Sequence, residues 1–155
     1  MTTITLDAIK SRQDELAGMI AAFEAQVRDT KIFVLPEIEI TLQPGEHYAG
    51  IIVGKEDEPS HHLILLPGEA ESVTWKGSKD WAAEIGGELP TRREQSLLFA
   101  NLHDQFQSAW YWSCEEHASD SACAWIQDFG SGYQGNDRKG SEFRARAVRR
   151  LPISA

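Results

Sequence analysis

Apolar residues near the start of the chain recur at alternating spacings of three and four. Thr5 or Asp7 can cap a helix here, and the repeat ends before Thr30, where a β-type run begins. The spacing predicts one helix over residues 6–28 that carries a heptad-type stripe with one polar member. The stripe consists of Leu6, Ile9, Gln13, Leu16, Ile20, Phe23 and Val27.

Two interpretations of this stripe are open. About three heptads are marginal for a free-standing coiled coil in water. In the first interpretation the stripe packs as an amphipathic face on the chain's own globular domain. In the second it forms a coiled coil with copies from other subunits. In the second case Gln13 sets the register. We favour self-association, because the helix precedes a segment that already looks like a complete domain. We expect a homo-oligomer, a trimer before a dimer by analogy with trimeric adhesin domains.

Residues 31–75 have the pattern of β-strands. Ile38, Ile40 and Leu42 alternate with polar residues and predict a half-buried strand. The Pro-Gly pair that follows predicts a turn, and hence a hairpin with a second strand over residues 47–53. A third, almost wholly apolar strand is expected over residues 62–66.

The pattern turns helical from Ser78. Ser78 can cap a short helix over residues 78–85, which a Gly-Gly pair ends. Thr91 and Glu94 have the spacing of a capping box, in which each side chain bonds the other's backbone N–H, and they predict a helix over residues 92–105.

Three short strands are expected after these helices, over residues 111–113, 124–129 and 143–151. Helices packed beside short antiparallel strands describe an α+β domain. We therefore expect an N-terminal helical segment, 1–30, that can serve in oligomerisation, and one domain over 31–155.

Four motifs follow one another in the second half of the chain. They are Glu88-Leu89-Pro90-Thr91-Arg92-Arg93-Glu94, Ala109-Trp110-Tyr111-Trp112-Ser113, Cys123-Ala124-Trp125-Ile126-Gln127-Asp128-Phe129-Gly130 and Arg144-Ala145-Arg146-Ala147-Val148-Arg149-Arg150. The ordered set resembles the Lcl C-terminal domain family, found at the ends of collagen-like adhesins and in many phage and prophage proteins. The resemblance covers residues 63–152. It implies a C-type lectin-like fold, whose irregular loops bind ligands, and it departs from the family at Cys114, where a second Ser is usual.

Composition narrows the function classes. The 155 residues are 41% hydrophobic and carry a net charge of −9, which repels nucleic-acid phosphates and argues against general nucleic-acid binding. No run approaches the length of a membrane span, so we expect no membrane insertion. The first residues lack the features of a signal peptide, and two cysteines suit a reducing compartment. We expect a protein made in the host cytoplasm and, in one interpretation, associated with the virion.

The best candidate for ligand binding is the polar segment over residues 130–141, together with the residue that precedes it. Its Tyr, Gln, Asn, Ser and Arg side chains offer adaptable hydrogen bonds and one amphipathic aromatic. A solvated hairpin loop would have a similar composition. The candidate ligand-binding residues are Asp128, Ser131, Tyr133, Gln134, Asn136, Asp137 and Arg138. Such a composition also occurs in hypervariable loops, but one sequence shows no variation.

Metal binding and catalysis find little support. The pair Asn136-Asp137 lacks a second calcium motif, and Cys114, His117 and Cys123 lack a fourth zinc ligand at suitable spacing. Cys114 with His117 could form a thiolate pair, but no third residue or oxyanion donor is evident. We expect free thiols, no metal, no cofactor and no enzymatic activity.

Arginines are concentrated in the last predicted strand. Pairing with the chain's many carboxylates is one role for them, and binding of a phosphate or carboxylate ligand is another. They are Arg144, Arg146, Arg149 and Arg150.

Together these features favour a non-enzymatic ligand-binding protein of phage or prophage type, an adhesin or a virion-associated receptor-binding accessory. Its ligand would be a glycan or a host or virion protein. The alternative is an intracellular anti-defence or regulatory protein that binds a host factor or a small nucleotide. A purely structural accessory to assembly is a third interpretation.

Overall fold

The computed structural model describes residues 3–154 and divides after Leu35 into two compact units. The division falls slightly beyond the boundary expected after residue 30. No helix within the described residues is both long and apolar enough to cross a lipid bilayer.

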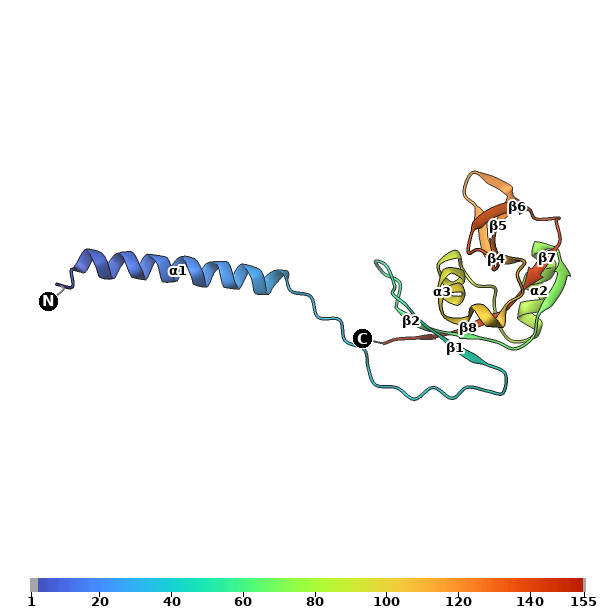
Figure 1. The fold of residues 1–155 in the computed structure, drawn as a ribbon, viewed down its shortest axis with the longest axis horizontal. Helices are drawn as coiled ribbons and strands as arrows, with labels where there is room; N and C mark the ends of the chain where they lie inside the picture. Colours follow the sequence, from blue (N-terminus) through green and yellow to red (C-terminus); the bar gives the residue numbers. More distant parts are fainter. Residues whose placement is uncertain (1–2, 155) are drawn as a thin grey trace. The chain divides into compact units, whose positions relative to one another are not determined.

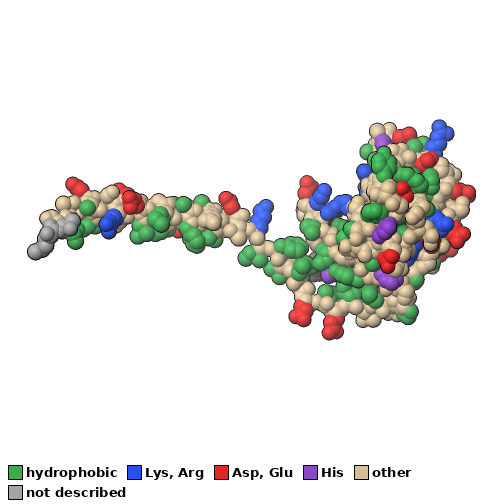
Figure 2. Space-filling model, in the orientation of Figure 1, with side chains coloured by type: hydrophobic (Ala, Val, Ile, Leu, Met, Phe, Trp, Pro, Cys, Tyr) green, Lys and Arg blue, Asp and Glu red, His purple; other side chains and the backbone are tan. Residues whose placement is uncertain are grey.

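The first unit consists of the helix α1 (Leu6–Asp29) and an extended stretch after it. The Thr5 hydroxyl accepts a hydrogen bond from the Ala8 backbone N–H at 3.2 Å and so caps the helix start. The helix expected over residues 6–28 is confirmed. No residue of this described helix is buried, and the six apolar members of the stripe are 50–66% exposed, so hydrophobic side chains line the helix in Figure 2.

The second unit begins with a three-stranded antiparallel sheet in the order β1-β2-β8. Its strands are β1 (His47–Ile52), β2 (His61–Leu65) and β8 (Val148–Pro152), which run side by side in Figure 1. The central strand β2 carries Leu63, Ile64 and Leu65, all fully buried. A strand that is apolar on both of its faces requires cover on both faces of the sheet.

The expected hairpin between residues 38–42 and 47–53 is wrong. The turn before β1 does form, with Glu46 N–H donating to the Gln43 carbonyl at 3.0 Å, but β1 pairs with β2 instead. Residues 36–42 are extended and join no ladder of the described chain. Side chains hold this segment, because Arg149 donates to the Thr41 carbonyl at 3.1 Å and the Glu46 carboxylate accepts from Gln43 N–H at 2.8 Å.

The second sheet is a curled five-stranded half-barrel in the order β3-β7-β4-β5-β6. Neighbouring strands are antiparallel except for the parallel contact between β4 and β7. Its strands are β3 (Ala70–Val73), β4 (Trp110–His117), β5 (Asp120–Asp128), β6 (Gln134–Arg138) and β7 (Phe143–Ala145). The strands expected over 111–113 and 124–129 are therefore present, whereas β6 lies within a segment expected to be a loop.

The single strand expected over residues 143–151 is two strands in different sheets. The ladder stops at Arg146 and Ala147, between β7 and β8. Ala147 is fully buried, and its carbonyl accepts from Leu66 N–H at 2.9 Å. The guanidinium of Arg146 donates to the carbonyls of Gln105 and Leu66. These bonds hold the chain where it leaves one sheet for the other.

Two helices complete the unit, α2 (Trp75–Glu84) and α3 (Arg92–Leu102). The start of α2 is capped by Thr74 and not by Ser78, which is fully buried inside the helix and donates its hydroxyl to the Trp75 carbonyl at 2.6 Å. The capping box of α3 is confirmed in both directions. The helix is shorter than expected, because a 3₁₀ turn, η1 (His103–Gln105), follows Leu102.

The core consists of two clusters. One gathers Trp75, Trp112 and Ile126 between α2 and the half-barrel, and the other gathers Leu63 and Leu98 beneath α3 with further residues. The remaining buried members of the second cluster are Ala49, Leu65, Tyr111, Phe129 and Val148. The architecture is α+β, as the sequence predicts.

Trp112 and Trp125 each lie within a predicted strand, so the sequence predicts that both indoles are largely buried. Their environments differ. Trp112 is 0% exposed, and its indole N–H donates to the Val73 carbonyl at 2.8 Å. Trp125 is only partly buried, beside Arg92 and His117. The expectation holds fully for Trp112 and in part for Trp125, whose indole is covered by the side chains of Arg92 and His117 and not by the apolar core.

We therefore expect Trp112→Ala to lower the free energy of unfolding by about 3–5 kcal/mol, the cost of emptying a buried indole site. Trp125→Ala should cost less, about 1–2 kcal/mol, since much of its surface contact is with polar side chains. Chemical denaturation of both variants against the parent measures the difference. Equal losses would contradict the assignment of Trp125 to a partly open site.

Candidate functional site

The segment expected to bind ligand is a tight turn followed by the edge strand β6. The Asp128 carboxylate accepts from Gly130 N–H at 2.8 Å and from the Ser131 hydroxyl at 2.7 Å. Gly132 has φ of +83°, and a Cβ there would lie 2.9 Å from the Phe99 ring, so only glycine suits the position. Asp128 and Ser131 thus stabilise the turn.

The other predicted residues divide between the two faces of β6. Pairing with β5 places Gln134 opposite Gln127, Asn136 opposite Trp125, and Arg138 opposite Cys123, all on one face. Tyr133 and Asp137 alternate to the other face.

On that other face the two side chains have separate environments. Tyr133, which is 68% exposed, lies edge-on to Trp110. The Asp137 carboxylate accepts from the Ser141 hydroxyl at 2.7 Å and from Arg138 N–H at 2.6 Å. The seven residues therefore do not converge on one site.

Gln134 connects β6 to the start of α3. Its amide nitrogen donates to the Gln127 side-chain oxygen at 2.7 Å and to the Arg92 carbonyl at 2.8 Å. Its amide oxygen accepts from Arg92 Nε at 3.1 Å. Gln127 is fully buried and donates to the Gln95 carbonyl at 3.0 Å. Hydrogen bonds of side-chain amides therefore connect the core to the surface at this point.

The Arg92 guanidinium lies over an aromatic ring. Its guanidinium carbon is 3.5 Å from the centroid of the Trp125 ring, within the range of a cation–π contact. The His117 ring stacks on the same indole, with 5.2 Å between the ring centroids and an interplanar angle of 24°. Trp125 therefore supports Arg92, which is half-buried.

A polar groove of about 450 Å³ opens beside Arg92 and Gln134. It lies between the first turn of α3, the hairpin β1-β2 and the strands β4 and β6 of the half-barrel. Its lining residues are Ile52, Glu58, His61, Thr91, Arg92, Arg93, Ser96, Glu115 and Gln134. Of the seven predicted binding residues, Gln134 alone is among them.

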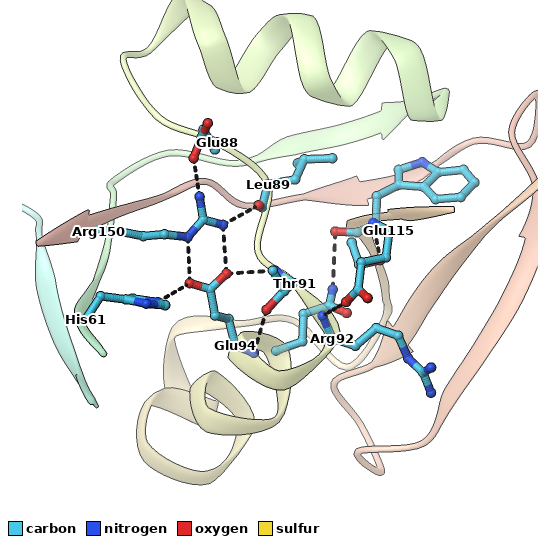
Figure 3. A network of polar contacts seen from close by, with 11 residues as sticks. His61, Glu88, Leu89, Thr91, Arg92, Glu94, Glu115 and Arg150 are labelled. Carbon is cyan, nitrogen blue, oxygen red and sulfur yellow. Dashed lines mark hydrogen bonds and ion pairs between the residues drawn. The ribbon is translucent and has the colours of Figure 1, made fainter. Parts of the chain in front are cut away.

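The first turn of α3 is fixed on two sides. The Thr91 hydroxyl accepts from Glu94 N–H at 3.2 Å, while the Glu94 carboxylate accepts from Thr91 N–H at 2.8 Å. The Glu115 carboxylate of β4 accepts from the next free N–H, that of Arg92, at 2.6 Å. Figure 3 shows the Arg92 side chain turned away from the Glu94 carboxylate. A negative side chain at a helix start is stabilised there by the helix dipole.

Behind the groove, Glu94 is the centre of a buried ion network (Figure 3). Its side chain is 0% exposed, and it accepts from Arg150 through Nε and Nη2, each at 2.7 Å, and lies 2.8 Å from His61 Nε2. Arg150 also contacts the Glu88 carboxylate and donates to the Leu89 carbonyl at 3.1 Å. Burial alone would raise the pKa of Glu94, but the bonds from Arg150, Thr91 and His61 outweigh it and hold the pKa below its usual range.

Three of the four arginines of the last predicted strand pair with carboxylates, as one interpretation of the sequence expected. Arg144 pairs with Glu69 at 2.8 Å and Arg149 with Glu46 at 2.9 Å, in addition to the pairs of Arg150. Arg146 contacts backbone carbonyls instead. These arginines hold the fold together.

Both cysteines are free thiols. Burial raises the pKa of Cys114 to about 11, the opposite of what a nucleophilic thiol requires. The Cys123 thiol lies 3.4 Å from the Asp120 carboxylate, and burial together with this contact raises its pKa as well. Within residues 3–154, no cluster of three or more His, Cys, Asp or Glu has a geometry suited to a metal ion.

Arg92, Trp125 and His61 were missed because each needs a neighbour from another element. The capping box marks the start of α3 and so places Arg92 on its first turn, and strand alternation places Trp125 and Gln127 on one face. No local signal brings the two elements together. No model of a known protein family matches the chain, and no curated protein matches it either.

We expect Glu94→Gln to lower the free energy of unfolding by about 3 kcal/mol, because it removes the charge that compensates Arg150. Glu88→Gln is the matched control, since the Glu88 side chain is 73% exposed and its pair with Arg150 should contribute less than about 1 kcal/mol. Urea denaturation at neutral pH compares the two. Equal, small losses would contradict a stabilising role for the buried carboxylate.

The same network predicts a pH dependence. The pKa of Glu94 is lower in the folded chain than in the unfolded chain, so its contribution is complete above the unfolded-state value and is lost as the pH falls through the folded-state value. Between about pH 6 and about pH 3, stability should fall more steeply for the parent than for Glu94→Gln. Parallel curves for the two proteins would refute this assignment.

Proposed function

We propose that the chain is a non-enzymatic ligand-binding protein of phage or prophage type, an adhesin or a virion-associated receptor-binding accessory. The observation that carries the proposal is the groove beside α3, where Arg92 is held over Trp125 by Gln134 and lines an open polar cavity. Binding sites combine a few precisely placed polar groups with a rigid frame.

The domain is proposed to be a C-type lectin-like member of the Lcl C-terminal domain family. Support comes from the four ordered motifs and from where they fall in the α+β fold. The Leu-Pro-Thr-Arg motif forms the start of α3, and the two Trp motifs form the neighbouring strands β4 and β5. The closing arginine-rich motif connects the two sheets through β7 and β8.

Self-association through α1 is the second part of the proposal. Within residues 3–154, fourteen of the eighteen exposed large hydrophobic side chains lie between Ile4 and Leu42. Exposed apolar surface that is concentrated in one region marks an interaction site, and the heptad spacing of the helix fits a second copy of itself. A trimer is the favoured state.

A glycan array and intact bacterial cells, both probed with the full-length chain, test ligand binding. We expect binding to a defined group of surface glycans or to a host or virion protein. We also expect the chain to be present in stoichiometric amount in particles of the phage that encodes it. Capture of an intracellular host factor or a nucleotide, with no surface ligand and no presence in particles, would support the intracellular alternative instead.

Light scattering tests the assembly. At micromolar concentration the parent should have the mass of several chains, and Ile20→Glu should have the mass of one, because the substitution places a charge in the apolar seam. Ala25→Glu, on the same helix but away from the stripe, is the matched control and should leave the mass unchanged. A parent with the mass of a single chain would refute the seam.

A further inference from the structure

The guanidinium of Arg92 is preorganised. Its Nε donates to Gln134, its central carbon lies over the Trp125 ring, and Gln134 is itself held by the buried Gln127. An arginine side chain normally loses considerable rotational freedom when it binds a ligand. Here most of that freedom is already lost in the free protein, which favours binding.

The two terminal amino groups of Arg92 remain available. Among the described residues, neither makes a hydrogen bond, although the neighbouring Arg93 donates through Nη2 to the Val53 carbonyl at 2.8 Å. A guanidinium that is satisfied at Nε and open at its two amino groups presents a planar pair of donors. That pair matches the two oxygens of a carboxylate.

The charge of the groove favours a ligand with one negative charge. Arg93, Glu58 and Glu115 also line it, so two carboxylates balance its two arginines, and the chain as a whole carries −9. Glu115 is held at the start of α3 by its bond with Arg92 N–H. A polyphosphate would be repelled by these carboxylates, whereas a single carboxylate needs only the one guanidinium.

The remaining groups of the groove suit hydroxyls. Glu58 is exposed, and its carboxylate can accept hydrogen bonds. The Ser96 hydroxyl donates to the Arg92 carbonyl at 3.2 Å and accepts from the Gln134 amide at 3.4 Å, which leaves it one lone pair for a further bond. A cavity of about 450 Å³ is within the range of small-ligand sites.

From this combination we infer that the groove binds an acidic sugar, a pyranose that carries one carboxylate, with the carboxylate paired to the terminal amino groups of Arg92. This inference rests on the proposed ligand-binding function and names the ligand class of its site. Trp125, Gln134 and Gln127 act as positioning residues behind Arg92.

Titration of the full-length chain with methyl glucuronide and with methyl glucoside, followed by calorimetry and by tryptophan fluorescence, tests the inference. The two probes differ only at the carboxylate. We expect the glucuronide to bind at least about tenfold more tightly, the scale of one charge-assisted bidentate pair, and to change the emission of Trp125, because the carboxylate pairs with the cation stacked on it.

Arg92→Gln should abolish the preference for the glucuronide, and Arg92→Lys should reduce it, because an ammonium keeps the charge but not the planar pair of donors. Lys76→Gln removes one positive charge from an exposed position of α2 and should leave the preference unchanged. Melting curves confirm that each variant is folded. Should Arg92→Gln unfold the chain, Arg92→Lys alone decides.

Equal binding of the two methyl glycosides, or a preference that survives in Arg92→Gln, would overturn the inference. Inorganic phosphate that competes as well as the glucuronide would also overturn it, by showing a general anion site. If the array reveals neutral glycans only, the ligand-binding function stands and the acidic-sugar inference fails. If no surface ligand is found at all, both fail.

Discussion

The buried carboxylate of Glu94 is the interaction on which the arrangement of the second unit depends. Both of its oxygens have two donors, one from Thr91 N–H and Arg150, the other from Arg150 and His61. These donors come from α3, β8 and β2, so one side chain ties the helix start to two strands of the three-stranded sheet. A carboxylate removed from water is tolerable only with such complete bonding, and this requirement makes the geometry specific.

The consequence for the groove is direct. Since Glu94 fixes the first turn of α3, it also fixes the direction in which Arg92 leaves the helix. On the half-barrel side, Gln134 accepts a hydrogen bond from Arg92 and the Trp125 ring lies against its guanidinium. The candidate site thus depends on the junction between the two sheets. Arg146 and Ala147 connect β7 of one sheet to β8 of the other.

Local signals in the sequence predicted the helices well. The heptad stripe, the capping box at Thr91 and Glu94, and the Gly-Gly pair after α2 depend on neighbours within one or two turns. The cap of α2 was misplaced by four residues, because Thr74 and Ser78 are equally good caps by composition. Only burial against the half-barrel decides that Ser78 lies inside the helix.

Strand pairing was predicted less well, since pairing is decided by tertiary partners. Residues 38–42 alternate as a strand should, yet no ladder forms there, because β2 pairs with β1 and with β8. The polar strand β6 has no apolar period to reveal it and is recognised only by its register with β5.

The candidate site was predicted only through Gln134. Composition identifies residues able to make hydrogen bonds but does not show whether the chain already uses that ability. Asp128, Ser131 and Asp137 use theirs to stabilise their own turns. Arg92 was overlooked because it belongs to a helix, although it lines the groove and keeps two donors open.

On the proposed function, the open groove and the exposed helix stripe explain each other. A site whose one charged contact comes from a single arginine binds a small ligand weakly, because association costs several kcal/mol of lost freedom before any contact contributes. Copies joined through α1 would present several such sites together, and avidity can exceed single-site affinity by about 10²–10⁴ when the geometry permits simultaneous binding. The extended residues 30–35, which follow the helix, would then set how far apart those sites can reach. On this proposal the assembly helix offsets the weakness of the single site, and further copies of the chain cover the apolar stripe of α1.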